Sequence, residues 1–157
     1  MLIEYFKPAS ERNGLLRVFC RRVVTREEED GEIARAAALA ARADAAVVCI
    51  GMPEGYESEG VDRPGLELPG RQADLVRAVA AANPRTIVVV NSGAPVAMPW
   101  LDRVPVVLQA FYPGQEGGRA IARILLGEVN PSGKLPVTFP RRLEDTPAFL
   151  DCLGGLE

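Results

Sequence analysis

The chain has 157 residues, a formal net charge of −3 and 48% hydrophobic residues. This is about one domain's length, and the composition predicts a packed core rather than disorder. The negative charge argues against nucleic acid or an anionic membrane as partner, and no apolar run reaches the roughly 20 residues that span a bilayer. The chain has no histidine. This excludes His-dependent triads and the usual zinc enzymes, so acid–base chemistry must come from Asp, Glu, Lys, Tyr or Cys.

The cysteines Cys20, Cys49 and Cys152 are far apart and odd in number, with no zinc spacing and no disulfide framework. Cys49 lies in an apolar run, which predicts a small buried side chain. We expect no metal and no cofactor. The N-terminal residues show no charged region followed by an apolar stretch, so no signal peptide is visible and a cytoplasmic location is expected.

Residues 2–7 and 15–24 alternate between apolar and polar side chains, which predicts two short strands. The polar stretch from Ser10 to Gly14 between them is a turn signal, so a β-hairpin is expected. The pattern changes at Thr25. Thr25 and Glu28 resemble a capping box, although Gly31 weakens the first turn and allows a later helix start. An apolar stripe at helical spacing follows: Ile33, Ala37, Ala40 and Ala41.

The rest of the chain alternates between short apolar runs and helical patterns. Strands are predicted at 45–50, 86–90 and 104–109, and helices at 70–82, with Leu75, Val79 and Ala82 inward, and at 115–126, ending at Gly127. A further short strand is predicted at 135–139. Because each strand is apolar throughout, the fold class is α/β, a three-layer sandwich with a mostly parallel sheet covered on both faces, plus the N-terminal hairpin.

In open α/β sheets, ligands bind beyond the carboxyl ends of the strands. The loop after the first predicted parallel strand carries Glu54, Glu57, Glu59 and Asp62 within nine residues, with Arg63 next. Crowded like charges raise carboxyl pKa values, and a carboxyl with a raised pKa can donate a proton near neutral pH. Composition alone favours the alternative, a solvated acidic loop.

Other segments at strand ends have simpler explanations. The turn from Ser92 to Pro95 could hold a phosphate or another ligand, but it lacks a phosphate-binding glycine pattern and a chain reversal is favoured. Gly117 and Gly118 open the last helix, where close packing of helix on sheet is favoured over anion binding. Trp100 could stack on a sugar, but a lone tryptophan is more often part of the core.

Several long motifs in order resemble the second, α/β-sandwich domain of glycoside hydrolase family 3, whose best-known members are β-glucosidases. The similarity runs from Ala43 to Pro140 and rests on these segments: Glu57-Ser58-Glu59-Gly60-Val61-Asp62-Arg63, Leu66-Glu67-Leu68-Pro69-Gly70-Arg71-Gln72, Ala82-Asn83-Pro84-Arg85-Thr86, Asn91-Ser92-Gly93-Ala94-Pro95, Gln109-Ala110-Phe111-Tyr112-Pro113-Gly114, and Asn130-Pro131-Ser132-Gly133-Lys134.

The resemblance extends to a subgroup that carries a PA14 β-domain inserted in the sandwich domain. The hairpin is similar to the last two strands of that insertion, and residues 143–149 are similar to the subgroup's tail. The resemblance therefore implies two units: residues 1–24 as the end of a PA14 insertion, and residues 25–157 as a partial sandwich domain of a truncated family member.

For activity, the resemblance implies a retaining glycosidase that hydrolyses O-glycosidic bonds, with a β-linked glucoside or oligosaccharide as substrate. It places the acid/base on Glu59, with Glu57 as runner-up, and has Asp62 and Arg63 hold the loop in shape. The family's usual Asn-Glu-Glu-Trp before this glutamate is Pro53-Glu54-Gly55-Tyr56 here. The family's nucleophile is an aspartate of a TIM-barrel domain, in a Ser-Asp-Trp context that this sequence lacks.

We therefore expect little or no hydrolysis from this chain alone. Two other interpretations stay open. The chain could be a non-catalytic fragment that self-associates as a homo-oligomer through an exposed sheet edge. It could also be a small-ligand-binding α/β module, which the lack of a phosphate-loop pattern disfavours.

Overall fold

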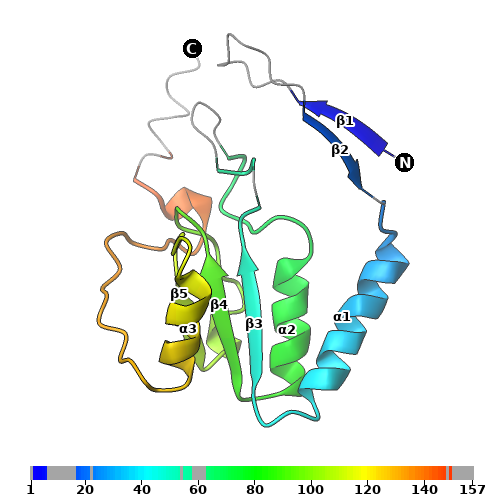
Figure 1. The fold of residues 1–157 in the computed structure, drawn as a ribbon. Coiled ribbons are helices and arrows are strands. Elements are labelled where there is room, and N and C mark those ends of the chain that lie inside the picture. Colours follow the sequence, from blue (N-terminus) through cyan, green and yellow to red (C-terminus); the bar gives the residue numbers. More distant parts are fainter. Residues whose placement is uncertain are drawn as a thin grey trace.

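The computed structural model describes residues 2–6, 17–21, 23–53, 55–57, 63–147 and 149, and for 2–6 and 17–21 it describes the backbone alone. Figure 1 shows these elements in chain order. Strands β1 (Leu2–Phe6) and β2 (Arg17–Arg21) pair antiparallel. The predicted hairpin is confirmed, although its turn from Ser10 to Gly14 lies outside the described residues.

Helix α1 (Arg26–Ala40) begins at a complete capping box. The hydroxyl of Thr25 accepts from the backbone N–H of Glu28 at 3.3 Å, and the Glu28 carboxylate accepts from the backbone N–H of Thr25 at 2.9 Å. Two otherwise unpaired donors are thereby satisfied. Gly31 does not delay the helix, because the capping box already fixes the first turn.

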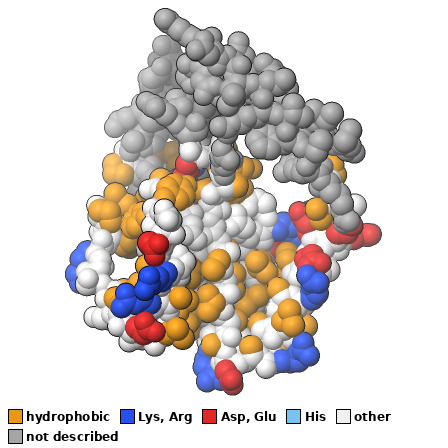
Figure 2. Space-filling view, viewed as in Figure 1, with side chains coloured by type: hydrophobic (Ala, Val, Ile, Leu, Met, Phe, Trp, Pro, Cys, Tyr) orange, Lys and Arg blue, Asp and Glu red, His pale blue; other side chains and the backbone are white. Residues whose placement is uncertain are grey.

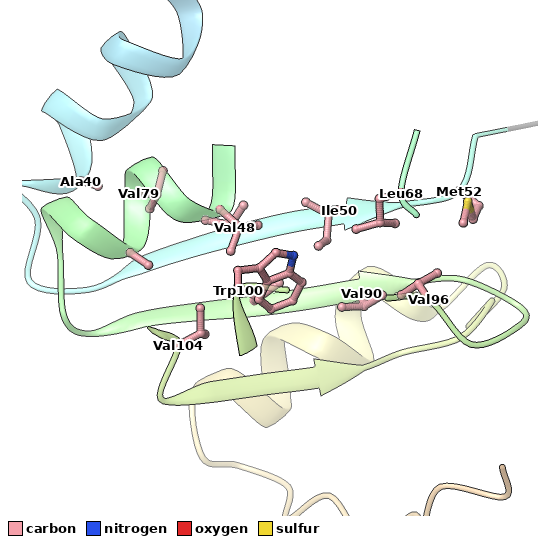
Figure 3. Packing of buried hydrophobic residues seen from close by; sticks show 13 residues of the cluster. Ala40, Val48, Ile50, Met52, Leu68, Val79, Val90, Val96, Trp100 and Val104 are labelled. Atoms are coloured by element: carbon pink, nitrogen blue, oxygen red, sulfur yellow. The ribbon is translucent and has the colours of Figure 1, made fainter. Parts of the chain in front are cut away.

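Three parallel strands form the sheet, in the order β3 (Ala46–Gly51), β4 (Thr86–Asn91) and β5 (Val106–Gln109). Helix α2 (Gln72–Ala82) connects β3 to β4 and packs on both strands, and α1 packs on α2. Helix α3 (Gly117–Leu125) follows β5 and lies on the opposite face of the sheet from Trp100 (Figures 1 and 3). The α/β layering is as predicted. Two 3-10 turns complete the described elements, η1 (Leu101–Arg103) and η2 (Leu143–Asp145).

The core lies between α2 and the sheet. Trp100 is fully buried there, over strands β3 and β4 (Figure 3), so it is part of the core rather than a sugar platform. Helix α2 buries Val76, Val79 and Ala80. The predicted inward face was therefore slightly out of phase, since Leu75 and Ala82 are only half-buried.

The other face of the sheet is unevenly covered. The central strand β4 is buried on both faces, with Val88, Val89 and Val90 each 0% exposed. On the edge strand β3, Val47 is 49% exposed and Cys49 is exposed. The predictions of a sheet covered on both faces and of a buried Cys49 are therefore wrong at β3, because none of the described helices lies against its outer face. Hydrophobic side chains (orange) are accordingly visible at the surface near the middle of the molecule in Figure 2.

The C-terminal predictions are partly confirmed. Helix α3 ends where expected, with Gly127 at φ +76° after the C-cap residue Leu126. Residues 135–139 form no strand. Gly117 meets Pro113 rather than the sheet, since a Cβ on Gly117 would lie 2.4 Å from Pro113 Cγ, and a Cβ on Gly118 would meet nothing. No helix of the described part of the chain is long and apolar enough to cross a bilayer.

Candidate functional site

The acidic loop starts at a firmly held strand end. The Gln72 side chain pairs with both backbone groups of Gly51: its Oε1 accepts from the Gly51 N–H at 2.7 Å, and its Nε2 donates to the Gly51 carbonyl at 2.9 Å. On the other side, the Met52 N–H donates to the Asn91 carbonyl at 2.9 Å. A Cβ on residue 51 would lie 2.2 Å from the Asn91 oxygen. Only glycine fits this approach of two backbones.

Glu57 lies against the turn that follows β4. Its Oε2 accepts from the Gly93 backbone N–H at 2.7 Å, and its Oε1 accepts from the Ala94 N–H at 3.2 Å. The turn from Ser92 to Pro95 does hold an anion, but that anion is a side chain of the same protein. Neither the ligand loop nor the plain chain reversal considered from the sequence describes this arrangement.

Arg63 holds the same carboxylate from the far end of the acidic loop. Its Nη1 lies 3.1 Å from Glu57 Oε1, and its Nη2 donates to the Pro95 carbonyl at 2.7 Å. The side chains of Arg63 and Glu57 are only 15% and 14% exposed. A pair this far out of water is screened less than an ordinary surface ion pair.

Tyr112, in the loop after β5, donates its hydroxyl hydrogen to Glu57 Oε2. The residue before it, Phe111, has φ +53°, which among the described non-glycine residues is the one positive φ. Such a conformation is unusual for a bulky side chain and is held by its surroundings. Sequence reasoning missed this tyrosine, although it lies in the quoted Gln109–Gly114 motif.

The balance of these contacts sets the protonation state of Glu57. Burial raises the pKa of its carboxyl, but the hydrogen bonds from Tyr112, Gly93 and Ala94 and the charge of Arg63 outweigh burial and leave the pKa below its ordinary value of 4.5. The pKa of Tyr112 is raised above 10.0. Burial is the largest cause, and the hydrogen bond to Glu57 and the negative charge of Glu57 add to it. The expectation that crowding raises the carboxyl pKa values of the loop is wrong for Glu57, because these donors decide the sign.

Of the predicted site residues, the structure brings Glu57 and Arg63 together. Glu54, Glu59 and Asp62 lie outside the described residues. The described part of the chain holds no cluster of three or more His, Cys, Asp or Glu side chains that could bind a metal ion. The contacts of Glu57 instead unite three of the quoted sequence motifs, at the carboxyl ends of β3, β4 and β5.

Residues 7–153 match the family model described as "Glycosyl hydrolase family 3 C-terminal domain". The chain belongs to this family. The match crosses the boundary proposed at residue 24, so the two-unit division and the PA14 origin of the hairpin stay predictions.

Relatives of this family 3 domain are β-glucosidases. The probable β-glucosidase J of Aspergillus fumigatus is 49% identical over 131 residues, and the β-glucosidase of Rhizobium radiobacter is 41% identical over 151 residues. The alignments cover 83% and 96% of this chain but only 15% and 18% of those proteins. The chain thus spans less than a fifth of the length of these curated relatives.

Solved structures agree with the fold. The crystal structure of the β-glucosidase from Kluyveromyces marxianus superposes with a TM-score of 0.82 at 45% identity, covering 87% of this chain and 16% of that one. DesR, a β-glucosidase from Streptomyces venezuelae crystallised with D-glucose, gives a TM-score of 0.69 at 52% identity over 74% of this chain and 15% of that one. The α/β fold of this chain is therefore that of a family 3 C-terminal domain.

Proposed function

We propose that this domain supplies the acid/base carboxyl of a retaining β-glucosidase-type hydrolase, that Glu59 is this residue, and that the substrate is a β-linked glucoside or oligosaccharide. The membership in family 3 and the names of the relatives support the activity. The position of the acidic loop beyond the carboxyl end of β3, where α/β sheets bind ligands, supports the site.

The observation that carries the assignment is the bonding of Glu57. A general acid must hold a proton and have an oxygen free to face the leaving group. The Glu57 carboxylate instead accepts from four groups, and its pKa is lowered. This argues against the runner-up Glu57 and in favour of Glu59, the residue on which the resemblance to the family also places the acid/base.

The proposed reaction has two steps. A carboxylate attacks the anomeric carbon while the glycosidic C–O bond breaks, and the Glu59 carboxyl gives its proton to the departing oxygen. Glu59, now a carboxylate, then takes a proton from water, whose oxygen attacks the anomeric carbon and releases the first carboxylate. The two carboxyl groups of a retaining glycosidase are about 5–5.5 Å apart.

The attacking carboxylate would come from a barrel domain. The Ser-Asp-Trp context of the family's nucleophile is missing from the 157 residues. We therefore expect no more than trace hydrolysis of an aryl β-glucoside by this chain by itself. Clear turnover that Glu59→Gln abolishes would contradict that expectation.

A chimera tests the proposed function. This chain replaces the matching part of the Kluyveromyces marxianus enzyme, and hydrolysis of phenyl β-glucoside is compared with that of 2,4-dinitrophenyl β-glucoside. Phenolate is a poor leaving group and must be protonated as it departs. Dinitrophenolate is a good leaving group and departs almost without help from an acid. Glu59→Gln should lower the rate with the phenyl substrate by about 10²- to 10⁴-fold, the usual contribution of a general acid.

In the same variant, the first-turnover burst of dinitrophenolate should be nearly unchanged, because that step requires no acid. The matched control is Glu32→Gln, which changes an exposed carboxylate distant in sequence from Glu59. It should behave as the parent chimera. An inactive parent chimera, or equal losses with both substrates in Glu59→Gln, would overturn the proposal.

We also propose self-association through β3 as a second property. Within the described sheet β3 pairs with β4 alone, and its Val47 and Cys49 are exposed. An unpaired edge with apolar side chains is a template for pairing with a second copy. Sedimentation velocity checks this, and a monomer at high concentration would refute it.

A further inference from the structure

We infer that Glu57, Arg63 and Tyr112, together with the backbone N–H groups of Gly93 and Ala94, form a carboxylate clamp that positions the acid/base segment of the loop. Its catalytic consequence rests on the proposed function, but its existence as a bonded unit does not. Glu57, Arg63 and Tyr112 are thus positioning residues, which act on the reaction through Glu59.

The acceptor capacity of Glu57 is fully used. Oε1 accepts from Arg63 and from the Ala94 N–H, and Oε2 accepts from Tyr112 and from the Gly93 N–H. A carboxylate has about four lone-pair sites, so none remains for substrate or water. A side chain with this bonding serves to hold the chain in place rather than to react.

The clamp holds both ends of one short segment. Glu57 and Arg63 are six residues apart and joined at 3.1 Å, and Glu59 lies between them in sequence. Fully extended, six residues would reach roughly 20 Å. Both ends are instead bonded to the turn after β4, Glu57 to the N–H groups of Gly93 and Ala94 and Arg63 to the carbonyl of Pro95.

The surroundings are shaped for this contact. A Cβ on Gly93 would lie 2.7 Å from Tyr112 Cε2 and 3.0 Å from Glu57 Oε2, so a larger residue would force the Tyr112 ring or the Glu57 carboxylate to shift. The positive φ of Phe111 immediately precedes Tyr112. Uncommon backbone conformations of this kind are retained where a specific geometry is required.

Small misplacements of a catalytic group are costly: about 1 Å can lower a rate by roughly 10²-fold. Disruption of the clamp should therefore affect the steps that use Glu59 as acid or base. Steps that need no proton transfer should be spared. This distinction separates a positioning role from a purely structural one.

The clamp itself is tested on the 157-residue chain by following the amide NMR signals of Gly93 and Ala94 during acid titration. In the wild type, both signals should titrate together, at one midpoint below 4.5. Tyr112→Phe should raise that midpoint, and Glu57→Gln should abolish the transition. Tyr56→Phe, which changes an exposed tyrosine of the same loop, should leave it unchanged. Different midpoints for the Gly93 and Ala94 signals, or a transition that persists in Glu57→Gln, would contradict the existence of the clamp.

The positioning role is tested by a double-mutant cycle in the chimera. Glu57→Gln should lower phenyl β-glucoside turnover by at least about 10-fold and leave the dinitrophenolate burst within about 3-fold, since displacement of Glu59 affects acid catalysis alone. When Glu57→Gln is combined with Glu59→Gln, it should cause little further loss of phenyl β-glucoside turnover. Tyr112→Phe, the milder change if Glu57→Gln fails to fold, should act in the same direction.

Losses that multiply in the double variant would refute positioning through Glu59. That result differs from failure of the proposed function, which would show as an inactive parent chimera or as equal losses with both substrates in Glu59→Gln by itself. In either case the amide titration decides separately whether the clamp exists.

Discussion

The hydroxyl of Tyr112 donates to the carboxylate of Glu57, which lies 55 residues earlier in the chain. The contact joins the loop after β3 to the loop after β5, and Gly93, from the turn after β4, donates to the same carboxylate oxygen. Three separate strand ends are thus tied to one side chain. The stability of this edge of the sheet should depend on that side chain and on the space around it.

Gly93→Ala should destabilise the chain because its Cβ would collide with the Tyr112 ring and the Glu57 carboxylate. Overpacking of this kind costs about 1–3 kcal/mol, and each kcal/mol lowers the Tm of a chain of this size by roughly 2–4 °C. Gly118→Ala is the matched control, since its Cβ meets nothing and alanine favours a helix. Thermal unfolding can be followed by fluorescence of the buried Trp100. Equal Tm values for the Gly93 variant and the wild type would contradict the prediction.

Glu57→Gln should lower stability in a pH-dependent way. The pKa of Glu57 is below 4.5 in the folded protein, so its ionised form stabilises the fold at any pH above 4.5. That contribution is lost as the pH falls through the lowered folded-state pKa. The Tm difference between wild type and variant should therefore be large at pH 7 and should shrink at pH 3. Glu32→Gln, which alters an exposed ion pair, should show almost no difference at pH 7. A constant difference across this range would refute the pKa assignment.

Much of the fold was predictable because the signals are local. The Thr25–Glu28 capping box, the β-branched run of β4 and Gly127 each act within a few residues. The exposure of Cys49 was not predictable, because an apolar strand looks the same at an edge and at the centre of a sheet. Its surroundings depend on which elements cover β3, and this information lies far away in the sequence.

The candidate site was predictable in part for the same reason. The acidic loop is visible as a cluster of carboxylates, and the family motif selects Glu59. The lowered pKa of Glu57 was not visible, since its donors Gly93 and Tyr112 are 36 and 55 residues away. Counting only the charges within the loop predicts a raised pKa for Glu57. The pKa is lowered instead, because hydrogen bonds from other strand ends outweigh the local repulsion.

Asn83→Ala should destabilise the junction between α1, α2 and β4. The buried Asn83 side chain donates to the carbonyls of Ala40 and Ala43, each at 2.9 Å, and accepts from the Arg85 N–H at 2.8 Å. Its removal leaves the Ala43 carbonyl and the Arg85 N–H without these partners, at about 1–3 kcal/mol, while the Ala40 carbonyl still accepts from the Ala43 N–H at 3.1 Å.

Asn83→Asp is the informative comparison for this site. It keeps the acceptor for Arg85 but places a carboxylate against two carbonyls, so we expect at least as large a loss as for alanine. Urea unfolding measures both free energies of unfolding. If either variant is as stable as the wild type, the carboxamide does not hold the junction.

Gln72→Glu should destabilise the start of the acidic loop, and its loss, like that of Glu57→Gln, should be larger at pH 7 than in acid. The Gln72 Nε2 donates to the carbonyls of Gly51 and Pro69 at 2.9 and 3.0 Å. A carboxylate of the same shape has no hydrogen to give, so its ionised form would face two acceptors, at about 1–3 kcal/mol. This disfavours ionisation and should raise the pKa of the introduced carboxyl in the folded state.

The loss should therefore be present at pH 7 and should diminish on acidification through that raised pKa, because the protonated carboxyl can again donate. Gln72→Ala removes the same two donors without adding a charge, and its loss should not vary with pH. Urea unfolding of both variants at pH 4 and pH 7 makes the comparison. Equal losses in both variants at both pH values would contradict the predicted effect of the charge, and no loss in either variant would mean that Gly51 is held by its neighbour Asn91 rather than by the carboxamide.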